Sequence, residues 1–103
     1  MKWWLEKDGG LVLGKGRCML LEAIDQRGSL REAARVCGIS YRAAWGKLRA
    51  SEERLGEALA ESQSGKRGMK ITPRARQLIR IFHSIDQKLE EATAAIVKKS
   101  LEE

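Results

Sequence analysis

Basic side chains recur along one stretch of this 103-residue sequence, at Arg42, Lys47 and Arg49, among residues that are mostly small or apolar. An arginine guanidinium presents two parallel N–H donors that match the O6 and N7 acceptors of guanine, and both residue types neutralise phosphate. On a helical wheel the two arginines lie broadly opposite an apolar side made by Ala44 and Leu48. The spacing therefore predicts a helix with one basic face, suited to nucleic-acid recognition.

Arg42 is the first candidate for base recognition, because it falls in the first turn of that helix, the part that reaches bases in helix-turn-helix proteins. Lys47 and Arg49 flank the outer face further along, so we expect phosphate contacts from them, with a solvated charge as the alternative. Gly46 costs the helix up to about 1 kcal/mol relative to alanine, yet it would let the backbone approach base edges. A tolerated surface glycine explains Gly46 equally well.

Two short helices joined by a tight turn would position this basic face. Ser29 and Glu32 have the spacing of a capping box, which predicts a helix over 30–37, and Gly38 can adopt the left-handed conformation that ends it. A second helix follows over 41–55. The pattern predicts a helix-turn-helix whose second helix enters the DNA major groove.

Further DNA contacts are expected where these two helices begin. Ser29 and Arg31 start the first helix, whose free N–H groups and positive dipole end suit a phosphate. Ser40 caps the second helix, and Tyr41 follows it on the border between the apolar side and the outer face. Trp45 lies on the same border, where we expect it to pack into the core. The predicted contacts therefore include Ser29, Arg31, Ser40 and Tyr41.

The rest of the chain divides into short elements around the helix-turn-helix. A β-hairpin is predicted over 2–14, because an Asp-Gly pair separates two β-prone runs. Apolar spacing predicts a helix over 17–27, and a wing of two weak strands is predicted over 57–71. The expected fold class is mainly α with small β, a winged helix-turn-helix in a single domain spanning 1–103.

The predicted wing carries its own basic residues, Lys66, Arg67 and Lys70, on or beside a glycine-flanked turn. Such a turn can reach the adjacent minor groove or the phosphates. A simple surface loop is the alternative for this segment.

A long helix is predicted over 73–97, because Thr72 is a good N-cap and the only proline occupies the first turn. It would measure about 37 Å, whereas a domain of about 100 residues has a radius of gyration of about 13 Å. Its overhanging apolar stripe predicts a homodimer, although a helix that folds back or frays after Leu89 is the alternative. A frayed end is expected over 98–103. The predicted interface residues are Leu78, Ile79, Phe82, Ile85, Leu89, Ala92 and Ile96.

Composition and spacing argue against several other functions. The formal net charge of +6 fits an anionic partner, and the charged N-terminus predicts a cytoplasmic protein without membrane contact. Cys18 and Cys37 lie far from His83 in sequence, so both are expected to be small buried hydrophobes, with no metal site and no cofactor. We expect His83 to bond Asp86 locally. Since no catalytic constellation appears, the chain is not expected to be an enzyme.

The predicted elements follow the order hairpin, helix, helix-turn-helix, wing and long helix. The most specific residues within that order are Gly28-Ser29-Leu30 with Ala33-Ala34, and Ser40-Tyr41-Arg42-Ala43-Ala44-Trp45. Over nearly the whole chain the sequence resembles the N-terminal DNA-binding domain of the ModE-type molybdate regulators, especially their small stand-alone relatives. Ser-Tyr-x-x-Ala-Trp is the most distinctive motif of that family. The LysR-type winged helix is similar in the remaining pattern. The resemblance implies a winged-helix homodimer paired through the long helix.

Two departures from that family affect what the resemblance implies. Family members often have a longer glycine-rich wing, whereas this one is short and basic, so its DNA contacts are left open. The family's oxyanion-binding domains would follow the long helix, so molybdate sensing is not expected within 1–103. The alternative function is a winged helix that binds a protein instead of DNA, and only DNA binding should weaken steeply with salt.

Overall fold

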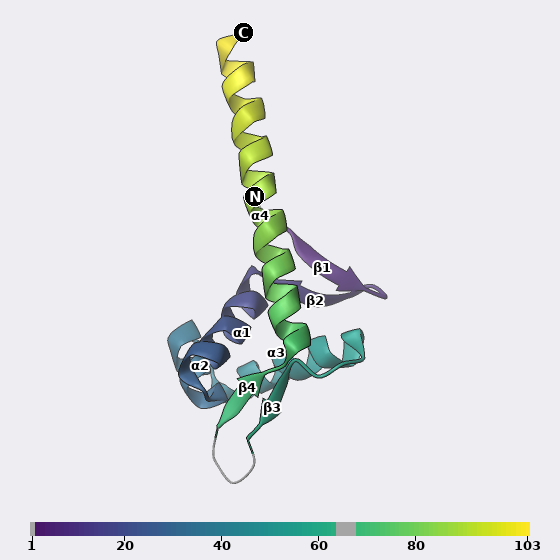
Figure 1. Ribbon diagram of the computed structural model, residues 1–103, viewed down its shortest axis with the longest axis vertical. Coiled ribbons are helices and arrows are strands. Elements are labelled where there is room, and N and C mark those ends of the chain that lie inside the picture. Colours follow the sequence, from purple (N-terminus) through teal and green to yellow (C-terminus); the bar gives the residue numbers. More distant parts are fainter. Residues whose placement is uncertain (1, 64–67) are drawn as a thin grey trace.

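The computed structural model describes residues 2–63 and 68–103 as a mainly helical fold with two small antiparallel hairpins (Figure 1). The expected fold class, a winged helix-turn-helix with small β, is confirmed. In chain order the elements are β1 (Trp4–Lys7), β2 (Gly10–Gly14), α1 (Lys15–Arg27), α2 (Leu30–Cys37), α3 (Tyr41–Leu55), β3 (Ala60–Ser62), β4 (Met69–Ile71) and α4 (Pro73–Glu102).

The N-terminal hairpin turns at Asp8 and Gly9, whose φ angles of 52° and 78° are both positive. Two residues with positive φ are what a type I′ turn requires, and this explains the Asp-Gly pair. The inner strand β2 buries Val12 and Leu13, and it packs against α3. The hairpin therefore supports the back of the helix expected to meet DNA.

The turn between α2 and α3 is closed by local hydrogen bonds. Gly38 ends α2 with φ 71°, and the N–H of Ile39 donates to the carbonyl of Ala34 in a Schellman motif. The Ser29 hydroxyl accepts from the Glu32 N–H at 3.0 Å, as half of a capping box does. The other half is not the expected one, because the Glu32 carboxylate pairs with Arg35 one turn further on.

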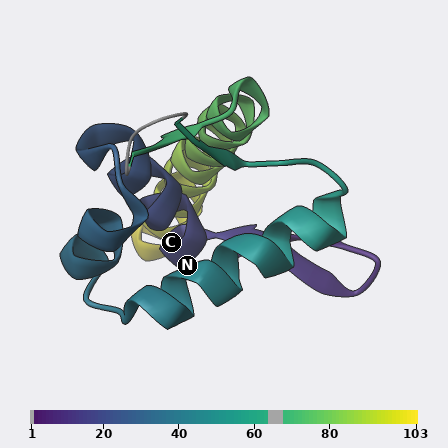
Figure 2. The same ribbon diagram turned by 90° about the horizontal axis from the view of Figure 1, so that it is seen from below.

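Helix α1 lies between α3 and the wing strands β3 and β4 (Figure 2). The N–H of Met69 donates to the carbonyl of Gly28 at 2.8 Å and joins the wing to the end of α1. The Glu52 carboxylate accepts from the N–H of Leu59 at 2.8 Å and fixes the chain where it leaves α3. These two contacts place the wing beside the helix-turn-helix.

The core forms where α1 meets its neighbours, and Leu13, Cys18, Ile24 and Leu59 are among its most buried side chains. Arg17 joins α1 to both β2 and α3, because its Nη1 donates to the carbonyl of Leu11 and to the Ser51 hydroxyl, each at 2.9 Å. Burial first, and the nearby Arg54 second, lower the pKa of Arg17.

Thr72 is the N-cap of helix α4, and its hydroxyl makes two hydrogen bonds. It accepts from the Ala75 N–H and donates to the Ala58 carbonyl. The expected end at residue 97 and the frayed segment 98–103 are wrong, since α4 continues to Glu102. Its last residues are good helix formers without glycine or proline. Similarly, α1 starts at Lys15 instead of residue 17.

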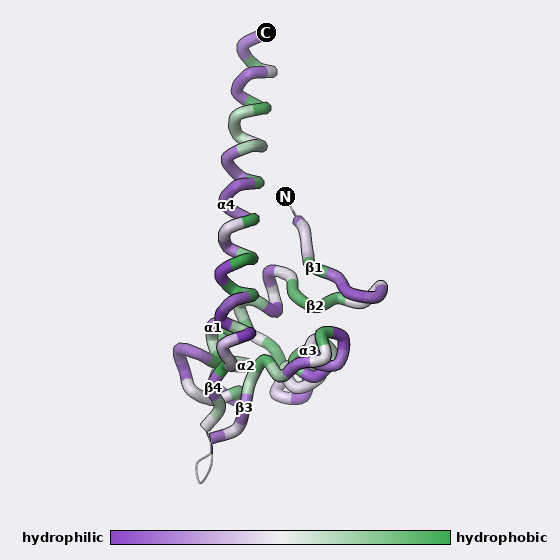
Figure 3. Tube along the Cα trace, turned by 45° about the vertical axis from the view of Figure 1, so that its right-hand side comes forward, coloured by the Kyte–Doolittle hydropathy of each residue, from purple (hydrophilic) through white to green (hydrophobic). Residues whose placement is uncertain are grey.

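The C-terminal half of α4 extends beyond the rest of the fold (Figure 1). With this helix included, the molecule measures 62 Å along its longest axis. Apolar residues recur along α4 to its far end (Figure 3). Within the described residues, no helix combines the length and apolar character needed to cross a membrane.

Candidate nucleic-acid interface

Helix α3 presents its basic residues to solvent and its apolar residues to the core. Ala44 and Leu48 are 0% and 3% exposed, whereas Arg42, Lys47 and Arg49 are exposed. Among the described residues, no ion pair involves these three cations. Their charges are therefore available to a polyanion without first breaking a salt bridge.

Gly46 lies on the same exposed face of α3. A Cβ built at this position would meet no atom of the chain within 4 Å, so packing inside the molecule does not require glycine there. Glycine weakens a helix interior, so Gly46 either serves a contact outside the monomer or is a tolerated surface residue.

Two arginines flank an aromatic pair across the junction of α2 and α3. Tyr41 and Trp45 meet edge to face, with ring centroids 6.3 Å apart. The Arg31 guanidinium lies 4.9 Å from the Tyr41 ring centroid, and that of Arg49 lies 5.8 Å from the Trp45 centroid. Cation–π contact orients a guanidinium while leaving its N–H donors free for phosphate. Sequence reasoning missed this cluster, because Arg31 and Tyr41 are ten positions apart and belong to different helices.

The helix starts have the expected caps. The Ser40 hydroxyl accepts from the Ala43 N–H at 3.0 Å, as the Ser29 hydroxyl does from Glu32. Each hydroxyl proton can still be donated to a phosphate. Trp45 packs against the core with part of its ring, as predicted.

The wing offers one described basic residue of the three predicted. Lys70 is exposed on β4, directly across from Glu61 on β3, which reduces the local positive charge. The predicted contacts Lys66 and Arg67 lie outside the described residues.

The predicted interface stripe of α4 divides into an inner and an outer part. Phe82 is 4% exposed because its ring stacks on Trp3 at 4.3 Å, so its assignment to the dimer face is corrected to the chain's own core. Leu78 and Ile79 also pack partly against that core. Ile85, Ala92 and Ile96 are exposed, and Leu89 is half-buried. The large exposed apolar side chains of α4 that the prediction omitted are Ile81, Val97 and Leu101.

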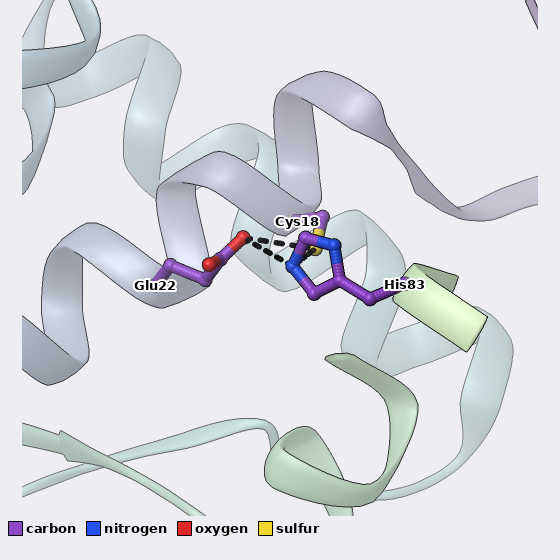
Figure 4. Close-up of side chains that lie close together, drawn as sticks. All are labelled: Cys18, Glu22 and His83. Carbon is purple, nitrogen blue, oxygen red and sulfur yellow. Dashed lines mark hydrogen bonds and ion pairs between the residues drawn. The ribbon is translucent and has the colours of Figure 1, made fainter. Parts of the chain in front are cut away.

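His83 does not pair with Asp86, so the expected local bond is wrong, and the fold brings His83 close to Cys18 although the two are distant in sequence. The crossing of α1 and α4 places His83 Nε2 3.1 Å from Glu22 Oε1 and 4.0 Å from Cys18 Sγ (Figure 4). Asp86 instead accepts from the Trp3 indole at 3.0 Å. Sequence spacing could not reveal these contacts, because they join helices about 60 positions apart.

The pattern of helix, turn and helix described above matches a known family. Residues 17–76 match the model of the bacterial regulatory helix-turn-helix proteins of the lysR family. Two similar relatives are the molybdenum transport protein ModE of Azotobacter vinelandii, 31% identical over 91 residues, and the molybdenum-pterin-binding protein MopB of Rhodobacter capsulatus, 34% identical over 80 residues. The first match covers 85% of this chain and 34% of ModE, and the second covers 75% and 30%. The chain therefore spans about a third of the length of these relatives.

Solved structures agree on the fold. The CbnR_DBD-DNA complex has a TM-score of 0.63 at 18% identity, covering 82% of this chain and 94% of that one. Vibrio fischeri DarR, solved in complex with DNA, has a TM-score of 0.61 at 14% identity, covering 82% and 28%. At these identities the likeness is one of fold.

Proposed function

The chain belongs to the bacterial regulatory helix-turn-helix proteins of the lysR family, and on that premise we propose that it is a transcriptional regulator that binds specific DNA sequences as a homodimer. The observation that carries the proposal is the face of α3, where exposed cations that form no ion pair within residues 2–63 and 68–103 lie opposite a buried apolar side. Such a helix is supported from behind and presents only its basic face to a groove.

In this proposal α3 enters the major groove and Arg42 reads a guanine, because Arg42 lies in the first helical turn and is exposed. Lys47 and Arg49 contact phosphates along the same groove. Tyr41 and Arg31 contact the phosphates of the adjacent DNA strand. The hydroxyls of Ser29 and Ser40, at the starts of α2 and α3, donate hydrogen bonds to phosphate oxygens.

The wing extends this surface on the other side of α1. Lys70, together with Lys66 and Arg67, would contact the backbone or the adjacent minor groove. The join between Met69 and Gly28 supports this role, because it keeps the base of the wing close to the start of α2.

The homodimer would form through the outer part of α4. Ile85, Leu89, Ala92 and Ile96 follow helical spacing along α4, whose C-terminal half leaves the domain (Figure 1), and Ile96 is 65% exposed. An exposed apolar stripe of this length favours a partner. Two paired chains place their α3 helices about 34 Å apart on a near-palindromic site in the cytoplasm.

The experiment that tests the function is selection of bound sites from random duplex DNA, followed by titration of the best site at two salt concentrations. We expect one enriched, near-palindromic sequence, and an affinity that falls with salt in proportion to the phosphates neutralised. No enrichment above random DNA would refute the proposal.

A winged helix that binds a protein is the second candidate, favoured by the exposed Trp4 on the hairpin together with the apolar side chains of α4. An apolar protein contact hardly responds to salt. Binding of a protein with little salt dependence, without selection of any DNA sequence, would support this candidate instead.

A further inference from the structure

Three side chains with metal-binding atoms converge where α1 crosses α4. Cys18 Sγ and Glu22 Oε1 are 3.3 Å apart, Glu22 Oε1 and His83 Nε2 are 3.1 Å apart, and the sulfur and the imidazole are 4.0 Å apart. The three atoms all lie within 4.8 Å of one another. Figure 4 shows the carboxylate, the thiol and the imidazole facing a common point.

These separations come close to those of a coordination shell. A tetrahedral zinc has Zn–S bonds of about 2.3 Å and Zn–N or Zn–O bonds of about 2.0 to 2.2 Å, so its ligand atoms lie about 3.3 to 3.6 Å apart. The observed distances differ from that range by about half an ångström or less. Small side-chain rotations therefore suffice, without moving either helix.

We propose that Cys18, Glu22 and His83 form a binding site for a thiophilic divalent transition metal, with Zn²⁺ as its representative. The donor set selects this class, because a thiolate and an imidazole disfavour Mg²⁺ and Ca²⁺, which prefer oxygen ligands alone. Three protein ligands leave one tetrahedral position for water or another ligand. The site lies apart from the proposed DNA-binding face of α3, so either proposal can fail without the other.

The surroundings of the site favour a cation and let one enter. After burial and Glu22, the negative charge of Asp86 also contributes to the raised pKa of the Cys18 thiol, and the same charge attracts a cation. The His83 side chain is 57% exposed, so the imidazole can swing into solvent and admit the ion. Cys18 itself is buried, which shields the sulfur from other reactions.

Binding exchanges a proton for the metal. Burial, and then the hydrogen bond to Glu22, raise the pKa of the Cys18 thiol to about 12, so the sulfur keeps its proton at neutral pH. When the ion binds, the S–H bond breaks, the sulfur electron pair forms the S–metal bond, and the proton passes to solvent.

A metal at this position would connect α1 to α4. Helix α1 packs against α2, the first helix of the helix-turn-helix, and α4 is the proposed dimer helix. The ion would therefore stabilise the angle between the helix-turn-helix and α4. The reason is that a ligand that binds only the folded chain stabilises the folded chain.

The test uses the full chain without any affinity tag, titrated with Co²⁺ and then displaced by Zn²⁺. We expect one equivalent of Co²⁺, with thiolate-to-cobalt charge-transfer absorption and tetrahedral d–d bands. His83→Gln and Glu22→Gln should each weaken binding at least about 100-fold, above the loss usual for an outer-shell partner. Cys37→Ser is the matched control and should bind as the wild type does.

Thermal unfolding provides the second readout and does not depend on DNA. Excess Zn²⁺ should raise the melting temperature of the wild type and of Cys37→Ser by at least about 5 °C, and that of His83→Gln by much less. A substitution of the buried Cys18 could unfold the chain, so His83→Gln and Glu22→Gln are the variants that decide the outcome. Absence of charge-transfer absorption, its loss in Cys37→Ser, or its survival in His83→Gln would overturn the proposal.

Discussion

At the scale of single residues, the distinction that matters on α3 is between reading a base and neutralising a phosphate. Arg42, in the first turn, is exposed and forms no ion pair among the described residues. The Arg49 guanidinium instead lies over the ring of Trp45, 5.8 Å from its centroid, and this contact orients it. A planar guanidinium free of partners suits the bidentate contact that base recognition needs.

Arg42→Ala should cost about 1 to 3 kcal/mol of binding to the selected site and relax the preference at one base position. Lys47→Ala should instead weaken binding to all sequences alike and reduce the salt dependence by about one phosphate. Fluorescence anisotropy on the selected site and on its single-base variants measures both. The control is Lys88→Ala on α4, which removes the same charge far from α3. Equal losses on every sequence for Arg42→Ala would show that it does not read a base.

The residue scale also shows how one cap can serve two elements. Thr72 caps α4 and at the same time bonds the carbonyl of Ala58 at the start of the wing. Glu52 performs a similar role at the end of α3, where its carboxylate accepts from Leu59. Both side chains connect neighbouring elements, so the start of the wing is anchored to α3 and to α4.

At the scale of elements, α3 is a helix whose exposed face contains its weakest residue. Gly46 is not required by packing, since a Cβ there would meet open space. If the helix backbone approaches the bases closely, glycine is retained for contact with DNA at the expense of helix stability.

The series Gly46→Ala and Gly46→Leu separates stability from DNA contact. Alanine should raise the free energy of unfolding by up to about 1 kcal/mol, because it is the better helix former. Affinity for the selected site should fall with alanine and fall further with leucine, since each added group pushes the backbone away from the groove. Urea denaturation and anisotropy titrations measure the two effects. Unchanged affinity across the series would identify Gly46 as a tolerated surface glycine.

At the scale of the whole molecule, the dominant feature is a helix that leaves its own domain. Helix α4 has 30 residues, which corresponds to about 45 Å. Trp3 covers Phe82 in the first half of this helix, and apolar residues recur along α4 beyond Phe82 (Figure 3). The monomer thus uses the first half of α4 for its core and leaves the second half exposed.

Ile96→Glu should convert the proposed dimer to a monomer at micromolar concentration. The substitution would bury a charged carboxylate between the apolar stripes of the two α4 helices. Ala95→Glu introduces the same side chain on the polar face next to Glu91 and Lys99, and it should leave the dimer intact. Sedimentation equilibrium gives both masses. A wild-type chain that is already monomeric under these conditions would remove the homodimer from the proposed function.

Local patterns were sufficient for most elements of this protein. Asp8-Gly9 predicted the hairpin turn, Ser40 and Gly38 predicted the limits of α2 and α3, and Thr72-Pro73 predicted the start of α4, because each depends on the φ and hydrogen-bonding preferences of a few adjacent residues. The exposed basic face of α3 followed from helical periodicity in the same way.

Contacts between distant segments depended on how the helices cross. The stacking of Trp3 on Phe82, the meeting of Arg31 with Tyr41, and the convergence of Cys18 with His83 each join residues from different elements. No local preference encodes such pairs, since the packing of α1 against α4 and of α2 against α3 sets them. For this reason the cluster of Cys18, Glu22 and His83 is visible in the folded chain and invisible in sequence spacing.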